Sequence, residues 1–178
     1  MTIAARIVRC RRKSIALIVT EDAQLVVRAP WHIPHFYIRS LLAKRQDWIE
    51  RKIAEVKNRP KLPPLSPEER AALIGEAEKV VRERCGWFAA RTGWQPAGIR
   101  ISNARRRWGS CGINGTLHFS WRLARAPLPV IDYVVVHELA HLAERNHSRR
   151  FWAKVAAVLP DFRRQRRWLR KNGHLLNG

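Results

Sequence analysis

The stretch Val134-Val135-Val136-His137-Glu138-Leu139-Ala140-His141-Leu142 decides the fold of this chain. His137 and His141 are four residues apart, so on a helix they lie on one face and can present ring nitrogens to one metal ion. Glu138 stands beside that pair, where its carboxylate can accept a proton from an attacking water. A plain core helix would have to bury all three ionisable groups, which a core tolerates only when they are paired or metal-bound. The stretch therefore favours a metal site on a buried helix.

A third ligand must come from another part of the chain. After His141 the remaining histidines and acidic residues are Glu144, His147, Asp161 and His174. Glu144 continues the ligand face but is displaced along the helix axis, so it does not easily complete a tetrahedron. His147 is far enough along for the chain to leave the helix and turn back. The spacing H-E-x-x-H-x5-H is that of the metzincins, but Glu144 replaces their glycine and the only methionine is Met1, so no Met-turn is possible.

Further motifs surround this stretch: Arg107-Trp108-Gly109-Ser110-Cys111, Trp121-Arg122-Leu123, Asn146-His147-Ser148 and Phe151-Trp152. With them the chain resembles the YgjP-like metallopeptidase domain family, SprT-related zincins described as predicted metal-dependent hydrolases. The resemblance extends to residues 26–30 and 65–70. It implies a zincin-like α+β fold in which the histidine of the Asn-His-Ser triplet, His147, is the third metal ligand.

The length and composition of the chain limit the class of protein to which it can belong. A chain of 178 residues with 46% hydrophobic content is long enough for one domain with a core. No apolar run approaches about 18 residues and no signal-peptide pattern is present, so we expect a cytoplasmic protein without a membrane partner. Cys10, Cys85 and Cys111 lack C-x-x-C spacing, which argues against a disulfide framework or a cysteine zinc site.

The charge balance is strongly basic. Thirty-five Lys and Arg residues against 14 acidic ones give a net charge of +21, with clusters at residues 9–13, 105–107, 149–150 and 163–171. Such a field attracts polyanions, including nucleic acids and nucleotides. A general arginine bias on solvated surfaces accounts for the same charge, and both interpretations stay open here.

The pattern of residues predicts a single domain over 1–178 in three parts. Residues 1–57 form a β-hairpin over 13–29, with its turn at 21–23, and one helix from Pro34 to about Lys57. Residues 58–66 are a proline-rich, semi-rigid linker. Residues 67–178 form the zincin core, in which a small mixed or antiparallel sheet packs on helices around the central H-E-x-x-H helix.

Within the zincin core, Ser66-Pro67-Glu68-Glu69 is a capping box that starts a helix ending near Arg91, with Gly93 as its stop. We expect the later elements in this order: strands over 99–102 and 116–120, the site helix over about 130–144, and helices over about 148–159 and 161–172. The strand over 116–120 is predicted beside the cleft, where it could pair with an extended peptide.

These features predict a zinc-dependent hydrolase, with a peptidase as the first interpretation. One zinc ion is held by His137, His141 and His147, and Glu138 is the general base. Tyr133, one turn before His137, either lines the site and donates to an oxyanion or packs in the core.

Two other functions are compatible with the same motif. One is the hydrolysis of nucleoside triphosphates to pyrophosphate, with arginines holding the phosphates. The other is a nucleic-acid-associated protease, as the SprT-like resemblance suggests. The candidate substrate- or polyanion-binding residues are Arg105, Arg107, His118 and Arg149.

Overall fold

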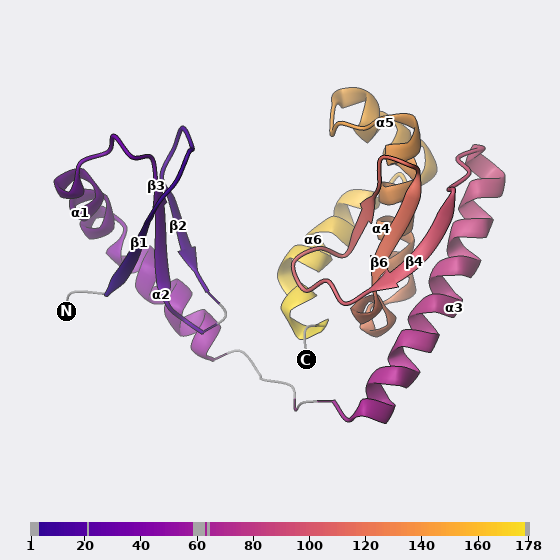
Figure 1. The fold of residues 1–178 in the computed structure, drawn as a ribbon, viewed down its shortest axis with the longest axis horizontal. Coiled ribbons are helices and arrows are strands. Elements are labelled where there is room, and N and C mark those ends of the chain that lie inside the picture. The colour runs from indigo at the N-terminus through magenta and orange to yellow at the C-terminus, as the bar shows by residue number, and fades with distance from the viewer. Residues whose placement is uncertain (1–3, 21, 59–62, 64, 177–178) are drawn as a thin grey trace. The chain divides into compact units, whose positions relative to one another are not determined.

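The computed structural model describes residues 4–20, 22–58, 63 and 65–176 (Figure 1). The fold is α+β, with helices and two small three-stranded sheets, as the sequence predicted. Contacts within the chain define two compact units, Met1–Lys61 and Leu62–Gly178. Most of the predicted linker, residues 59–62 and 64, lies outside the described residues. No helix among the described residues combines the length and apolar character needed to cross a membrane.

The first unit contains a mixed sheet of β1 (Ala5–Arg9), β2 (Ala16–Val19) and β3 (Leu25–Ala29) in the order β1-β3-β2. β2 and β3 pair antiparallel, which confirms the predicted hairpin; of its predicted turn, residue 21 lies outside the described residues. β1 pairs parallel to β3 and was not predicted.

The single helix predicted from Pro34 to Lys57 is wrong. The structure has two helices, α1 (His35–Lys44) and α2 (Gln46–Lys57), separated at Arg45, whose φ of −112° and ψ of 13° depart from helical values. Neither proline nor glycine marks this break, so the local sequence carries no signal for it.

The second unit begins with α3 (Pro67–Thr92), and both ends of this helix are as predicted. The Ser66 hydroxyl accepts from the backbone N–H of Glu69, and the Glu69 carboxylate accepts from the backbone N–H of Ser66, which completes the capping box. Gly93 ends the helix at a φ of 72°, in the left-handed region where glycine is favoured.

The second sheet consists of β4 (Gly98–Ser102), β5 (Gly109–Cys111) and β6 (Thr116–Ser120) in the order β4-β6-β5. β6 lies in the centre, parallel to β4 and antiparallel to β5. The prediction that the strand over 116–120 could pair with a peptide is therefore wrong, because both of its edges are occupied. β5 was not predicted, and it forms an edge of the sheet.

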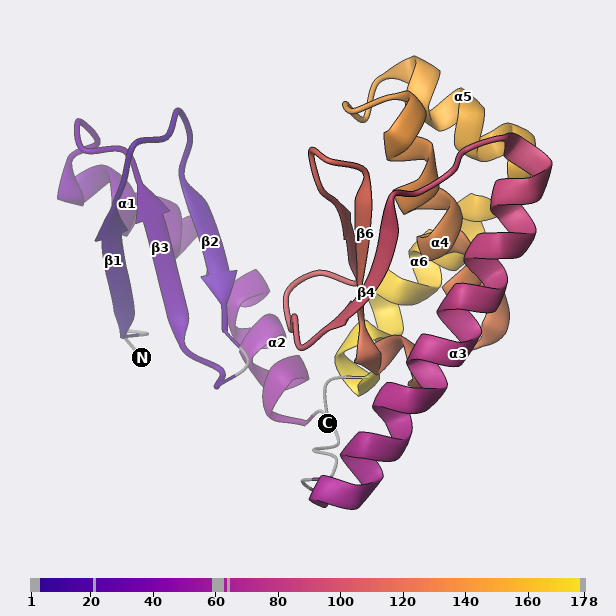
Figure 2. The same ribbon diagram turned by 45° about the vertical axis from the view of Figure 1, so that its right-hand side comes forward.

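The site helix is α4 (Leu128–Ala143), preceded by the 3₁₀ turn η1 (Trp121–Arg125). It is followed by α5 (Arg149–Val158), α6 (Phe162–Asn172) and the 3₁₀ turn η2 (Gly173–Leu176). α4 contacts α3, α5, α6 and β5. Figure 2 shows α3, α5 and α6 around it. A helix enclosed in this way is apolar on almost all faces, which explains its run of valines.

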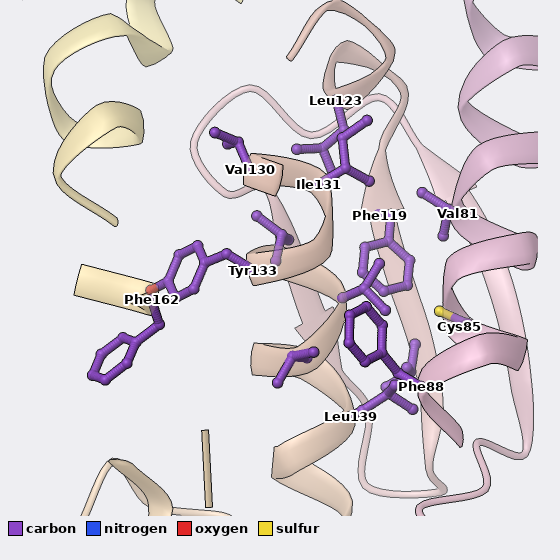
Figure 3. Close-up of a cluster of buried hydrophobic side chains, with 14 of the residues drawn as sticks. Val81, Cys85, Phe88, Phe119, Leu123, Val130, Ile131, Tyr133, Leu139 and Phe162 are labelled. Atoms are coloured by element: carbon purple, nitrogen blue, oxygen red, sulfur yellow. The ribbon is translucent and has the colours of Figure 1, made fainter. Parts of the chain in front are cut away.

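The core of the second unit holds α4 in place from two sides. Val81 and Phe88 of α3 and Phe119 of β6 fill the space on one side of α4, where Phe88 lies beside Leu139, whereas Tyr133 points to the other side of the helix, toward α6 (Figure 3). The fixed position of α4 gives its polar residues a rigid support.

Candidate metal centre

Three histidine side chains converge at the end of α4. Their candidate ligand nitrogens all lie within 4.8 Å of one another, and Nε2 of His137 is 2.9 Å from Nε2 of His147. His137 and His141 stand one turn apart on the helix, as their spacing predicts. α4 ends at Ala143, and Glu144 has an extended backbone (φ −149°, ψ 106°), so the chain turns back and brings His147 to the other two.

The surroundings of His137 and His141 favour the form of the imidazole that binds a metal. Nδ1 of His141 lies 3.2 Å from the carbonyl oxygen of Glu144, and donation through this nitrogen leaves Nε2 with a free lone pair. Burial, reinforced by the neighbouring His141 and His147, lowers the pKa of His137 to about 3. Burial also lowers the pKa of His141. Neutral imidazoles are the required ligand form, so the donor set suits a metal ion.

The ring of Phe151 packs against all three imidazole rings and restricts their orientation. The Phe151 ring centroid lies 4.5 Å from that of His141, 4.8 Å from His147 and 4.9 Å from His137. Phe151 is fully buried. Phe151 was singled out from the sequence as part of a motif of the family resemblance, and its contact with all three rings is seen only in the fold.

Glu138 lies beside the histidines without joining them. It is 5% exposed, and this burial raises the pKa of its carboxyl group to about 8, against the opposing effect of Arg107. The backbone of Gly109 packs directly on this side chain: a Cβ at residue 109 would lie 2.6 Å from Oε1. The carboxyl group is therefore enclosed between α4 and β5.

Two pockets meet at His137, Glu138 and Gly109. The first, of about 330 Å³, runs along β5 and is also lined by Ser110, Cys111, His141, Arg145 and His147. The second, of about 280 Å³, extends toward α6 and is also lined by Trp108, Tyr133, Val134, Arg166 and Leu169. The candidate metal centre is thus open to ligands from both sides of Glu138.

The outer edge of β5 faces these pockets with free backbone groups. Ser120 N–H donates to the Trp108 carbonyl and Gly112 N–H donates to the Thr116 carbonyl, both at 2.8 Å. In an antiparallel pair these bonds occur at every second residue, so the N–H and C=O groups of Gly109 and Cys111 point away from β6. No further strand among the described residues pairs with that edge.

The other predicted site residues lie at different distances from this centre. Tyr133 lines the second pocket, with its ring 5.9 Å from His137 and stacked on Phe162, so it both lines the site and packs against α6. Arg107 is exposed and close enough to lower the pKa of Glu138. Arg105 and Arg149 are exposed, and His118 is half-buried in β6.

Arg105, Arg149 and His118 line neither of the two pockets. Arg145 and Arg166 do line them, and neither was singled out from the sequence as a site residue. Arg145 follows the site helix by two residues, which could have indicated it, whereas Arg166 is brought in by the packing of α6.

Comparison with protein families gives one match. The model of the YgjP-like family, described as a metallopeptidase domain, matches residues 13–77 and 68–172. No curated protein and no solved structure matches the chain significantly. The match covers most of the chain and includes the three histidines, Glu138 and the whole of β5.

Proposed function

Because the chain belongs to the YgjP-like metallopeptidase family, we propose that it is a zinc-dependent peptidase that cleaves extended peptide segments bound along β5. Family membership makes the chain a metal-dependent hydrolase of the peptidase kind. The observation that carries the more specific proposal is the free edge of β5, which runs along the pocket that contains the histidines and Glu138.

Zinc is the metal that suits this donor set best. Three imidazole nitrogens with one position left open are typical of catalytic zinc sites, whereas magnesium and calcium prefer oxygen ligands. His137, His141 and His147 would hold the ion. When bound, zinc would polarise the scissile carbonyl and make water a nucleophile at neutral pH.

The chain's own groups supply the remaining steps. An extended substrate pairs with the N–H and C=O groups of Gly109 and Cys111, which holds its backbone in one register beside the metal centre. In its ionised form, which the positive charge of a bound zinc ion would favour, Glu138 accepts a proton from the attacking water and passes it to the leaving amine. Enclosure of Glu138 by Gly109 keeps its carboxylate in place for both transfers.

The surrounding charges favour a peptide over a nucleoside triphosphate. A phosphoanhydride site usually needs carboxylates to hold magnesium and several cations that converge on the phosphates. Asp132 is engaged by Arg84 at 2.5 and 2.9 Å, and Asp161 accepts from Gln165. Arg145 is already bound to the backbone carbonyls of Gly112 and Ile113.

The proposal is tested by incubating zinc-loaded protein with an unfolded protein substrate and, separately, with nucleoside triphosphates. We expect peptide cleavage that a chelator abolishes and zinc restores. Glu138→Gln should retain zinc but lose turnover by about 10²–10⁴-fold, the usual contribution of a general base. Release of pyrophosphate or phosphate that depends on Glu138, without any peptide cleavage, would overturn the proposal in favour of nucleotide hydrolysis.

A further inference from the structure

Most residues that line the second pocket at the candidate metal centre have no role in the proposed reaction. This pocket lies between β5, α4 and α6, and it opens beside Glu138 at the Gly109 end of β5. Most of its wall is apolar, contributed by Trp108, Tyr133, Val134 and Leu169. Its volume of about 280 Å³ is at the lower limit of pockets for small ligands, which suits a single side chain of a longer substrate.

Apart from His137 and Glu138 of the candidate metal centre, the lining of this pocket contains one charged side chain. Arg166 of α6 is exposed, and its guanidinium carbon lies 4.6 Å above the ring of Trp152. Stacking on Trp152 orients the guanidinium but leaves its N–H donors available. No hydrogen bond or ion pair joins Arg166 to another of the described residues. The neighbouring arginines of α6 are exposed but do not line the pocket.

The apolar residues and Arg166 together limit which ligand fits this pocket. A purely apolar side chain would use Trp108, Val134 and Leu169 but would gain nothing from the guanidinium. A phosphate group needs several converging cationic donors, and beyond the candidate metal centre this pocket offers a single arginine. A carboxylate on a short aliphatic stem uses both parts, because its methylene groups contact the apolar wall while Arg166 forms a bidentate ion pair with its oxygens.

We infer that this pocket binds the side chain of a glutamate directly next to the scissile bond of the substrate, and that Arg166 is the residue that determines this specificity. The inference rests on the proposed peptidase function and narrows it to a class of substrate. The other acidic residue, aspartate, reaches the same guanidinium with one methylene group fewer and should be accepted less well.

The test is a cleavage-site profile on a library of unstructured peptides, read by mass spectrometry. Wild-type protein should enrich glutamate at one position flanking the cleaved bond by about tenfold over glutamine, the effect expected of one charge-assisted pair. Arg166→Gln should lose that enrichment, Arg166→Lys should retain part of it, and Arg166→Glu should favour lysine or arginine instead. Arg167→Gln, a matched change at an exposed neighbour, should leave the profile unchanged.

A binding measurement separates this inference from the function on which it rests. In the Glu138→Gln background, tryptophan fluorescence can follow binding of two peptides that differ only by glutamate or glutamine. Cleavage of peptides without any acidic preference would overturn the role of Arg166 and leave the peptidase function intact. Absence of cleavage together with glutamate-dependent binding that Arg166→Gln abolishes would overturn the peptidase function and leave the pocket assignment standing. Equal binding of both peptides would overturn the pocket assignment.

Discussion

The backbone of Gly109 lies against the carboxyl group of Glu138 so closely that a Cβ at residue 109 would stand 2.6 Å from both Cγ and Oε1 of the glutamate. Real Cβ atoms essentially never approach other heavy atoms this closely. The edge strand and the site helix therefore meet at a position that only glycine can fill. The position of the proposed base depends on this contact as much as on its own helix.

Gly109→Ala should displace Glu138 and lower the rate of hydrolysis. A shift of about 1 Å in a catalytic group can cost roughly 100-fold in rate, and we expect a loss of that order. Zinc content should not change, because the three atoms nearest to a Cβ at residue 109 all belong to Glu138 and none to the histidines. Gly98→Ala in β4 is the matched control, since its nearest neighbour would be 3.8 Å away and the contact is an ordinary one. Equal kcat values for both variants would show that Glu138 tolerates the displacement.

His147→Ala should weaken zinc binding far more than Glu144→Ala. The first change removes one of the three converging nitrogens. The second preserves the backbone carbonyl to which Nδ1 of His141 donates. Removal of an outer-sphere partner of a metal ligand typically lowers metal affinity roughly 10–100-fold. We expect a smaller loss of zinc affinity for Glu144→Ala and a larger loss for His147→Ala. Competition titrations with a zinc chelator measure both, and the reverse order would exclude His147 as the third ligand.

The pH dependence of the stability of the metal-free protein should be determined by His137, which is half-buried, and its buried neighbour Glu138. The pKa of His137 is lowered from 6.5 to about 3, so the free energy of unfolding falls as pH drops below 6.5. The pKa of Glu138 is raised from 4.5 to about 8, so its contribution is present below pH 4.5 and is lost as pH rises toward 8. Above pH 6.5 only the decline caused by Glu138 remains.

Denaturant unfolding in the presence of a chelator, from pH 4 to pH 8.5, tests this dependence. Wild-type protein should be less stable at pH 8 than at pH 6.5. Glu138→Gln should remove that decline, because its side chain does not titrate, and should keep the loss of stability at low pH. A decline above pH 6.5 that persists in Glu138→Gln would show that another group causes it.

The basic surface should bind DNA in a salt-dependent manner if it serves recognition of polyanions. Exposed arginines line α6 at residues 163, 164, 167 and 170. Replacement of Arg163, Arg164 and Arg167 by glutamine should reduce the slope of log K against log salt by about 0.9 for each phosphate that the variant no longer neutralises. Fluorescence anisotropy with a short duplex measures the slope. Weak binding with little dependence on salt would instead favour a general arginine bias.

The sequence alone predicted that the three histidines of the candidate metal centre come together, because the signals for them are local. The spacing of His137 and His141 requires only a helix, and the family resemblance points to His147. The ends of α3 were equally accessible, since a capping box and a glycine at φ 72° act within a few residues. At these places the local chemistry and the tertiary structure agree.

The sequence could not reveal the parts of the site that depend on pairing between distant residues. β5 has the sequence Gly-Ser-Cys, which carries no alternation of apolar residues, and it is a strand only because β6 pairs with it. Because β5 was not predicted, the strand that pairs with a peptide was placed at residues 116–120 instead. Arg166 reaches the pocket only because α6 folds back on α4, a packing that no motif encodes.

The shortness of β5 also has a consequence for contacts between copies of the protein. An exposed strand edge is a template on which another chain can add, and long, flat edges promote aggregation. β5 presents an edge of three residues that starts with glycine, on a chain with a net charge of +21. Two such edges can form only a few hydrogen bonds with each other, and the like charges around them repel. The protein can therefore keep a strand edge open at its cleft without that edge becoming a site of self-association.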